Sequence, residues 1–511
     1  MSPHFRRRRP TSISSSLLTL SIFLLSGALI QACTFDWDSY DPRLGTGQTN
    51  SSSSSGIGGM GEASSSSSSG SMGGGGQVMS SSSSGDGGMA GAGGAGGMVA
   101  TGGMGGAGGM AGMGGGGGMG GGPCGGMYLL TEDFSQPVDT TWKWDVYAGP
   151  GTSSSLDNGQ WLLRLPANST TSHYAMLMSR LTYDLRGSEM FVDVSTVPNA
   201  LTTAQSSLIA LIDDANNLRF QYEQGKIYIA QKKNNVDMTR AQFTFDPILH
   251  RFWRMREQAG SFYWETSPDG MAWTIRSQTP TSTLAPVDYV YFLIDVYVSG
   301  AQMNPGEARY DNLNGGLPAM GNYCPVGTVQ DNFDDGITGH QWEQTNDANG
   351  CTYTEMGGEF IVTPPLTVSD YCGYTTSSAY DLRSNAVRVE VKQTTNTMAD
   401  TGTYLTVDAK GGKIEMAQEG DMLFMRYETP MTSADVGAEV YNPMQHRWWR
   451  IREKTGMIYW ETSADGMTWN IRAQTMTPIP VDAVDVSLAA GTGSVVAMPG
   501  EAHFDNFNIG P

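Results

Sequence analysis

Histidine, cysteine and positive charge are scarce in this chain of 511 residues. It contains six histidines, five cysteines and 30 lysines and arginines, against 50 aspartates and glutamates. No cysteine forms a CxxC pair or joins histidines at the spacing of a zinc site. The P-loop, HExxH and GxSxG motifs are also missing. A formal charge of −20 without a basic stripe repels phosphate backbones, so we expect no nucleic-acid partner.

Residues 1–32 have the features of an export signal. Arg6–Arg9 form a basic start, and the apolar stretch Leu17–Ile30 is shorter than the ~20 residues that cross a bilayer. The segment ends in Ile30-Gln31-Ala32-Cys33, which resembles a bacterial lipobox. The resemblance implies cleavage before Cys33 and acylation of that cysteine, giving a lipoprotein held at a membrane by several acyl chains. An ordinary cleaved signal peptide and an uncleaved anchor are the alternatives; Thr34, where some lipoproteins carry Asp, favours the outer membrane or cell surface.

We predict that residues 33–126 comprise the lipidated Cys33 and a disordered tether. Between residues 45 and 122 the chain is dominated by glycine and by serine runs, with scattered Met and almost no charge. Such a segment cannot bury enough apolar surface to offset the entropy of ordering. We expect a flexible coil that spans about 50 Å. The GxGxxG match at Gly103–Gly108 has no flanking strand or helix pattern, so we attribute it to composition.

The remainder of the chain consists of two copies of one sequence pattern. His250–Glu257 corresponds to His446–Glu453, and the offset between equivalent residues stays between 194 and 199. This is a domain duplication, not a short-period repeat. The second copy is the more acidic, with a net charge of −14 against −6 for the first. The predicted boundaries are 127–316 for copy 1, 317–327 for a linker and 328–511 for copy 2.

Each copy has the pattern of an all-β domain. Short alternating or β-branched runs such as Glu189–Val194 and Ala386–Val391 are separated by Gly, Pro, Asn and Asp. The Ser-x-Asp-Gly-x-x-Trp elements at Ser267–Trp273 and Ser463–Trp469 resemble those of concanavalin A-like lectin/glucanase (laminin G-like) domains, as do the Asp-Phe and Asp-Asn pairs that frame the copies. We therefore predict two tandem jelly-roll β-sandwiches.

A hairpin in each copy suggests a ligand-binding face. A two-residue turn at Thr455-Gly456 pairs Arg452 with Tyr459, Ile451 with Trp460 and Arg450 with Glu461, and Ala259-Gly260 gives the same register in copy 1. Alternation then places arginine, tyrosine and glutamate together on the face away from the core. Such side chains could bind a sugar, or they could form an ordinary solvated sheet face. The candidate ligand residues are Arg254, Arg256, Tyr263, Glu265, Arg450, Arg452, Tyr459 and Glu461.

No catalytic residues are predicted. Glycosidases that share the fold carry E-x-D-x-(x)-E on one strand, and neither copy contains this motif. We therefore expect a non-enzymatic surface or periplasmic protein that binds glycan or another surface ligand. The alternatives are a divergent glycan hydrolase and a purely structural or adhesive envelope protein. A second carboxylate within about 5–10 Å of Glu265 or Glu461 would favour the hydrolase.

The remaining cysteines predict two disulfides in an exported protein. Cys351 and Cys372 lie 21 residues apart within copy 2, and Cys124 and Cys324 flank copy 1. No cofactor is expected, and we expect a monomer. Ca²⁺ could bind where first and last strands meet, although carboxylates in edge turns without metal are the simpler interpretation. The candidate calcium ligands are Asp133 with Asp311, and Asp331 with Asp505.

Overall fold

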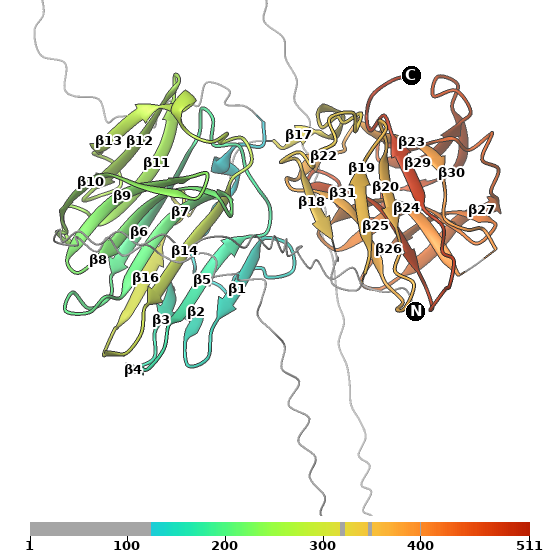
Figure 1. Ribbon diagram of the computed structural model, residues 1–511. Coiled ribbons are helices and arrows are strands. Elements are labelled where there is room, and N and C mark those ends of the chain that lie inside the picture. The colour runs from blue at the N-terminus through green and yellow to red at the C-terminus, as the bar shows by residue number, and fades with distance from the viewer. Residues whose placement is uncertain (1–123, 317–321, 346–349, 399) are drawn as a thin grey trace, which may run out of the picture. The chain divides into compact units, whose positions relative to one another are not determined.

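The computed structural model describes residues 124–316, 322–345, 350–398 and 400–511 (Figure 1). The predicted signal peptide, the lipidation site Cys33 and most of the predicted tether lie outside these residues. Nearly all regular structure in the described part is β-strand, and its helices are three-residue 3-10 turns: η2 (Met127–Leu129), η3 (Thr281–Thr283) and η4 (Val326–Thr328). None of the helices in the described ranges is long and apolar enough to cross a membrane.

Copy 1 is a sandwich of two seven-stranded antiparallel sheets, here called sheets A1 and B1. Sheet A1 has the strand order β1 (Trp144–Ala148), β5 (His173–Ser179), β14 (Tyr291–Val298), β7 (Gln205–Asp213), β8 (Asn216–Glu223), β9 (Lys226–Lys233) and β10 (Val236–Thr244). Sheet B1 has the order β13 (Thr274–Pro280), β12 (Ser261–Ser267), β11 (Phe252–Gln258), β6 (Glu189–Thr196), β16 (Glu307–Asp311), β3 (Gln160–Arg164) and β2 (Ser153–Asp157). A small separate sheet pairs β15 (Gln302–Met303) with β4 (Asn168–Ser169).

Copy 2 repeats this plan in sheets A2 and B2. Sheet A2 has the order β17 (Cys324–Pro325), β22 (Tyr380–Asp381), β31 (Val484–Thr492), β24 (Thr401–Ala409), β25 (Gly412–Glu419), β26 (Met422–Glu428) and β27 (Ser433–Val440). β21 (Tyr371–Thr376) also pairs with β31, and β18 (Trp342–Thr345) pairs with β21. Sheet B2 has the order β19 (Thr352–Glu355), β20 (Phe360–Thr363), β32 (Ala502–Asp505), β23 (Ala386–Gln393), β28 (Trp448–Lys454), β29 (Met457–Ser463) and β30 (Asn470–Met476).

The core of each copy lies between its two sheets, because every second side chain of a strand points inward. On β28, Trp449 and Ile451 are fully buried, whereas Arg450 and Arg452 face outward. Across the core, the indole N–H of Trp460 on β29 donates to the backbone oxygen of Glu415 on β25 at 2.9 Å. This bond joins the two sheets of copy 2. The prediction of all-β jelly-roll sandwiches is confirmed.

The predicted hairpin register is also confirmed. Arg452 pairs with Tyr459 and Arg450 with Glu461, and the equivalent pairs of copy 1 have the same register. Thr455 and Gly456 have φ values of 54° and 78°, the left-handed conformations of a two-residue turn that follows the twist of its strands. The turn thereby fixes which residues of β28 and β29 lie opposite one another.

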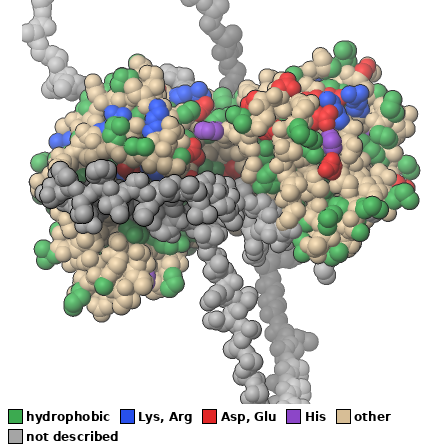
Figure 2. Space-filling view, in the orientation of Figure 1, with side chains coloured by type: hydrophobic (Ala, Val, Ile, Leu, Met, Phe, Trp, Pro, Cys, Tyr) green, Lys and Arg blue, Asp and Glu red, His purple; other side chains and the backbone are tan. Residues whose placement is uncertain are grey.

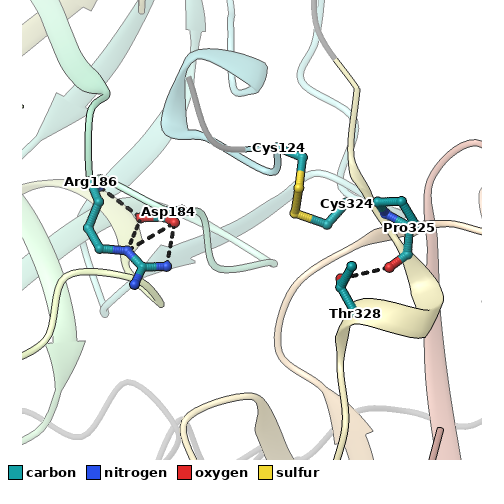
Figure 3. Close-up of a disulfide and its surroundings, with 6 residues drawn as sticks. All are labelled: Cys124, Asp184, Arg186, Cys324, Pro325 and Thr328. Atoms are coloured by element: carbon teal, nitrogen blue, oxygen red, sulfur yellow. Dashed lines mark hydrogen bonds and ion pairs between the residues drawn. A yellow bond between two sulfur atoms is a disulfide. The ribbon is translucent and has the colours of Figure 1, made fainter. Parts of the chain in front are cut away.

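The structure contains both predicted disulfides. Cys351 and Cys372 have Cα atoms 6.2 Å apart and close a loop of 21 residues beside β19 and β21. Cys124 and Cys324 have Cα atoms 4.7 Å apart (Figure 3). We expected this second bond because first and last strands of a jelly roll are neighbours. Instead, Cys324 opens β17, which pairs with β22 of copy 2, so the bond joins the segments that open the two copies.

Candidate functional site

The predicted ligand residues of copy 1 form one cluster on the outer face of sheet B1. Glu265 is 2% exposed and accepts hydrogen bonds from Arg254 Nε at 2.7 Å and from Arg256 Nε at 2.8 Å. The Arg256 guanidinium lies 4.3 Å from the ring centre of Tyr263, a cation–π contact. The Arg254 guanidinium lies 4.0 Å from that of Trp273, the tryptophan of the Ser-x-Asp-Gly turn. These charges therefore satisfy one another within the protein.

Copy 2 repeats the cluster on sheet B2. Glu461 accepts from Arg450 Nε at 2.6 Å and from Arg452 Nη2 at 2.8 Å, and Arg452 stacks on Tyr459 at 4.5 Å. Burial alone would raise the pKa of Glu461, but the hydrogen bonds and positive charges of the two arginines lower it below its ordinary value. Arginines that both bind a buried carboxylate and stack on aromatic rings brace the sheet. A ligand role for these eight residues stays a prediction.

The outer faces of sheets A1 and A2 are chemically different, because each carries an apolar cluster separate from the core. Apolar side chains in such a position, beside polar ones, are a common feature of ligand sites. In copy 1 the cluster consists of Met176, Met178, Ile209, Leu211, Tyr291 and Leu293, with Tyr147 and Tyr174 packed against it. In copy 2 it consists of Tyr404, Ala417 and Ala489, with Tyr371 and Phe424 packed against it.

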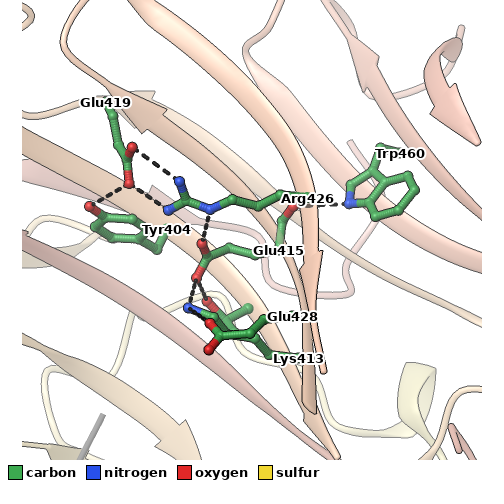
Figure 4. Close-up of polar contacts among 8 residues, drawn as sticks. Tyr404, Lys413, Glu415, Glu419, Arg426, Glu428 and Trp460 are labelled. Carbon is green, nitrogen blue, oxygen red and sulfur yellow. Dashed lines mark hydrogen bonds and ion pairs between the residues drawn. The ribbon is translucent and has the colours of Figure 1, made fainter. Parts of the chain in front are cut away.

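A charge network adjoins the aromatic cluster on sheet A2 (Figure 4). Arg426 on β26 donates to Glu415 Oε1 at 2.6 Å through Nε, and to Glu419 Oε2 at 3.1 Å through Nη1. Glu415 also accepts from the Thr406 hydroxyl at 2.9 Å and pairs with Lys413 at 3.2 Å. One guanidinium therefore holds two carboxylates of the same strand, β25.

Burial and charge act in opposite directions on the ionisation of Glu415. Its side chain is 1% exposed, and burial alone would raise its pKa. The positive charges of Lys413 and Arg426, together with hydrogen bonds, more than compensate and lower that pKa. Glu415 is consequently ionised at neutral pH.

This carboxylate pair departs from the glycosidase motif E-x-D-x-(x)-E. Glu415 and Glu419 stand at the first and last positions of an E-x-D-x-E spacing, but Ala417 occupies the middle position. Alternation along β25 places all three residues on the outer face. A search for two carboxylates four residues apart on a strand would have found them.

Copy 1 carries different side chains at the equivalent positions of sheet A1. With Glu223 placed on Glu419, Arg219 of β8 replaces Glu415 and Asn217 replaces Lys413. Arg219 binds Asp237 of β10 at 2.6 Å. The charge at the centre of the face is therefore reversed between the copies.

Asp295 of β14 is a buried carboxyl group on the outer face of sheet A1. It is 2% exposed and lies opposite Ser207 of β7. Burial raises its pKa to about 7, although hydrogen bonding to Ser207 and the charge of Arg219 oppose the rise. No hydrogen-bond partner of its Oδ1 atom exists among the residues that the structure describes.

The candidate calcium ligands are engaged in protein contacts. Asp133 accepts from Ser135, Asp331 accepts from the Trp342 indole at 2.7 Å, and Asp505 pairs with Lys392 at 2.7 Å. Burial, with smaller contributions from the charges of Asp193 and Asp133, raises the pKa of Asp311. In the described part of the chain, no three His, Cys, Asp or Glu side chains are grouped to hold a metal ion.

Charges of both signs are interspersed on the molecular surface. On the face shown in Figure 2, Lys and Arg side chains lie next to Asp and Glu side chains. Ion pairs such as Arg251–Asp193 and Arg447–Glu390 join neighbouring strands in both copies. Many surface charges in both copies therefore lie beside a charge of the opposite sign.

Comparisons with family models and with curated proteins give no match. Solved structures that resemble the chain include the catalytic domain of a laminarinase (endo-1,3-β-glucanase) from Thermotoga petrophila, at 9% identity and a TM-score of 0.29, covering 36% of this chain and 95% of that one. A laminarinase catalytic domain from Thermotoga maritima is 7% identical, with a TM-score of 0.28 and coverage of 36% and 94%. An uncharacterized protein from Mycobacterium paratuberculosis is 14% identical, with a TM-score of 0.28 and coverage of 36% and 99%.

Proposed function

We propose that this chain is a lipid-anchored surface protein that binds glycan without hydrolysing it, through the outer A-sheet face of at least one copy. The observation that carries the proposal is the apolar and aromatic cluster beside rows of polar side chains on this face. Sugar rings present apolar C–H faces that pack on aromatic rings, and hydroxyl groups that need hydrogen-bond partners. The B-sheet faces are less suited, because their arginines and glutamates bind each other.

The charge pattern argues against hydrolysis. Glycoside hydrolysis requires one protonated carboxylic acid and a second carboxylate on either side of the scissile bond. In copy 2 the lowered pKa of Glu415 leaves it suited only to the role of the second carboxylate, so Glu419 would have to donate the proton, and Glu419 is held in an ion pair by Arg426. In copy 1, Arg219 stands in place of Glu415, so the equivalent pair of carboxylates does not form.

A glycan hydrolase remains the second candidate, because Glu415 and Glu419 share one face of one strand. The test is to incubate the full chain with neutral and acidic oligosaccharides and to analyse the products by mass spectrometry. The proposal predicts intact oligosaccharides after prolonged incubation. Shortened products that Glu415→Gln abolishes, by a factor of at least about 100, would establish the hydrolase instead.

Binding itself is tested by calorimetry on the full chain. The panel consists of neutral hexasaccharides (cello-, laminari-, xylo- and mannohexaose) and of uronic-acid and sulfated oligosaccharides. The proposal predicts saturable binding of at least one member. Tyr404→Ala, Tyr147→Ala and the B-face variant Tyr459→Ala, measured in parallel, report which face is used. Failure of every oligosaccharide to bind would reject glycan binding and favour a structural or adhesive role.

The lipid anchor forms the second part of the proposal. It is supported by the lipobox-like segment that ends at Cys33 and by the glycine- and serine-rich tether that would lift the folded copies away from the lipid. Cells expressing the full chain are grown with an alkyne fatty acid. We expect label and membrane association in the wild type, and neither in Cys33→Ala. A labelled or membrane-bound Cys33→Ala protein would contradict the assignment.

A further inference from the structure

Two buried polar atoms on the outer face of sheet A1 have no hydrogen-bond partner among the described residues: Asp295 Oδ1 and Asn217 Nδ2. Asp295 is 2% exposed, and Asn217 is fully buried. Buried polar atoms are almost always paired in folded proteins, so each exception calls for an explanation, and a ligand that supplies the missing partner is one. Asp295 Oδ1 belongs to a carboxyl group, which accepts hydrogen bonds and, when protonated, can also donate one. Asn217 Nδ2 is an amide nitrogen and donates.

Arg219 connects these two residues and fixes the direction of the amide. Its Nη1 donates to Asn217 Oδ1 at 3.0 Å, its Nε donates to Gln221 Oε1 at 3.3 Å, and its Nη2 binds Asp237 at 2.6 Å. Because the oxygen of Asn217 is occupied by Arg219, the amide nitrogen is the atom left to bind a ligand. The guanidinium itself is committed to three partners within the protein.

The two residues are far enough apart for a chain of sugar rings, and too far apart for a single ring. Asp295 lies opposite Ser207, and Ser207 lies opposite Gln221, four residues along β8 from Asn217. Two strand spacings and four residues of rise separate the Cα atoms of Asp295 and Asn217 by roughly 16 Å. The apolar cluster that includes Ile209 and Leu293 lies on the same face between the two ends.

The equivalent positions of copy 2 have no such unpaired groups in the described structure. The row Asp295, Ser207 and Gln221 corresponds to Ala489, Tyr404 and Ala417, which belong to the apolar cluster. Lys413, which replaces Asn217, pairs with Glu415. At these equivalent positions sheet A2 therefore has either apolar side chains or paired charges, whereas sheet A1 leaves an acceptor and a donor buried and unpaired among the described residues.

We infer that the two copies are not equivalent, and that the outer face of sheet A1 in copy 1 binds a neutral oligosaccharide whose hydroxyl groups pair with Asp295 and Asn217. This inference rests on the proposed function and deepens it. A neutral ligand is favoured because Arg219 is already bound to Asp237 and because an anionic sugar would be repelled by the carboxylates nearby. The pKa of Asp295 is raised to about 7, so its neutral form is available at mildly acidic pH. The neutral carboxyl group can donate a hydrogen bond to a sugar hydroxyl as well as accept one.

The experiment measures the affinity of the full chain for the neutral hexasaccharides by calorimetry at pH 6. Asp295→Ala and Asn217→Asp each remove a hydrogen bond to the ligand, and we expect each to weaken binding about tenfold. Asp295→Asn keeps the shape, a donor and an acceptor, so we expect binding within about threefold of the wild type. Lys413→Ala is the copy 2 counterpart of the Asn217 change, and we expect no loss of affinity. Thermal unfolding of each variant checks that the fold is kept.

The outcomes separate this inference from the proposed function. Neutral hexasaccharides that bind the wild type, lose affinity in Asp295→Ala and Asn217→Asp, and keep it in Asp295→Asn support the inference. If glycan binds but the Asp295 and Asn217 variants bind as the wild type does, or if only Lys413→Ala loses affinity, the assignment to copy 1 is overturned while glycan binding stands. Preferential binding of the acidic oligosaccharides overturns the assignment to a neutral ligand.

Discussion

Replacing Glu355 by leucine should remove a loss of stability that copy 2 suffers as the pH rises. Glu355 ends β19 with 8% exposure and lies opposite Phe360, so its carboxylate is buried beside an aromatic ring. In copy 1 the equivalent residue is Leu156, which lies opposite Trp161. The duplication thus provides the apolar side chain that suits this position.

The sign of the pH effect follows from the raised pKa of Glu355. Burial raises that pKa from its ordinary value of 4.5 to about 7, with smaller contributions from Asp331 and Asp335, although hydrogen bonding with Tyr374 opposes the rise. The folded state therefore binds the proton more tightly than the unfolded state. The contribution of Glu355 to stability is fully present below pH 4.5 and is lost as the pH rises through 7. The shift corresponds to a fall of up to about 3 kcal/mol in the free energy of unfolding between pH 5 and pH 9.

The assay is denaturant unfolding of the full chain at pH 5, 7 and 9, for the wild type and for Glu355→Leu. The difference between the two proteins isolates Glu355, because other titrating groups such as Asp295 contribute equally to both. We expect Glu355→Leu to gain up to about 3 kcal/mol over the wild type on going from pH 5 to pH 9. Glu355→Gln, which cannot ionise, should show the same flattening of the pH profile. Parallel pH profiles for all three proteins would refute the reasoning.

Two further predictions concern the covalent and ionic bonds of copy 2. Replacing Cys372 by serine opens the 21-residue loop to Cys351 and should lower the free energy of unfolding by about 3 kcal/mol, as measured in urea; an unchanged midpoint would show that the bond does not constrain the unfolded chain. Glu461→Ala leaves Arg450 and Arg452 without their shared carboxylate and should cost about 3 kcal/mol, seen as a lower melting temperature; a variant as stable as the wild type would mean that water replaces the carboxylate without loss.

Local periodicity made most of the B-sheet hairpins predictable. A two-residue turn sets the register, and alternation then decides which side chains face the core, so Arg450, Arg452 and Glu461 were placed together correctly from sequence. The Cys351–Cys372 bond was predictable because the two residues flank one strand and its return. The position of Cys124–Cys324 depends on how β17 pairs with β22, a contact between segments that local patterns do not record.

The A-sheet faces were not found from sequence, because their strands are buried on both sides. On β8, Leu218 and Phe220 face the core while Arg219 and Gln221 are nearly as buried on the outer face, so alternation of burial disappears. The role of Asp295 also depends on which strand lies beside β14, and its partner Ser207 on β7 is 88 residues away in sequence. Which side chains pair across such separations in sequence is decided by the topology of the sheet, and local sequence patterns do not record that topology.

The most direct test of the account measures binding and cleavage in one sample. Full-length protein is titrated with neutral hexasaccharides at pH 6, and the recovered sugar is analysed by mass spectrometry. The account predicts saturable binding that Asp295→Ala weakens about tenfold, with the hexasaccharide recovered intact. Recovery of shortened sugars, or the absence of binding to any oligosaccharide, would contradict the claim that this chain is a non-hydrolytic glycan-binding protein.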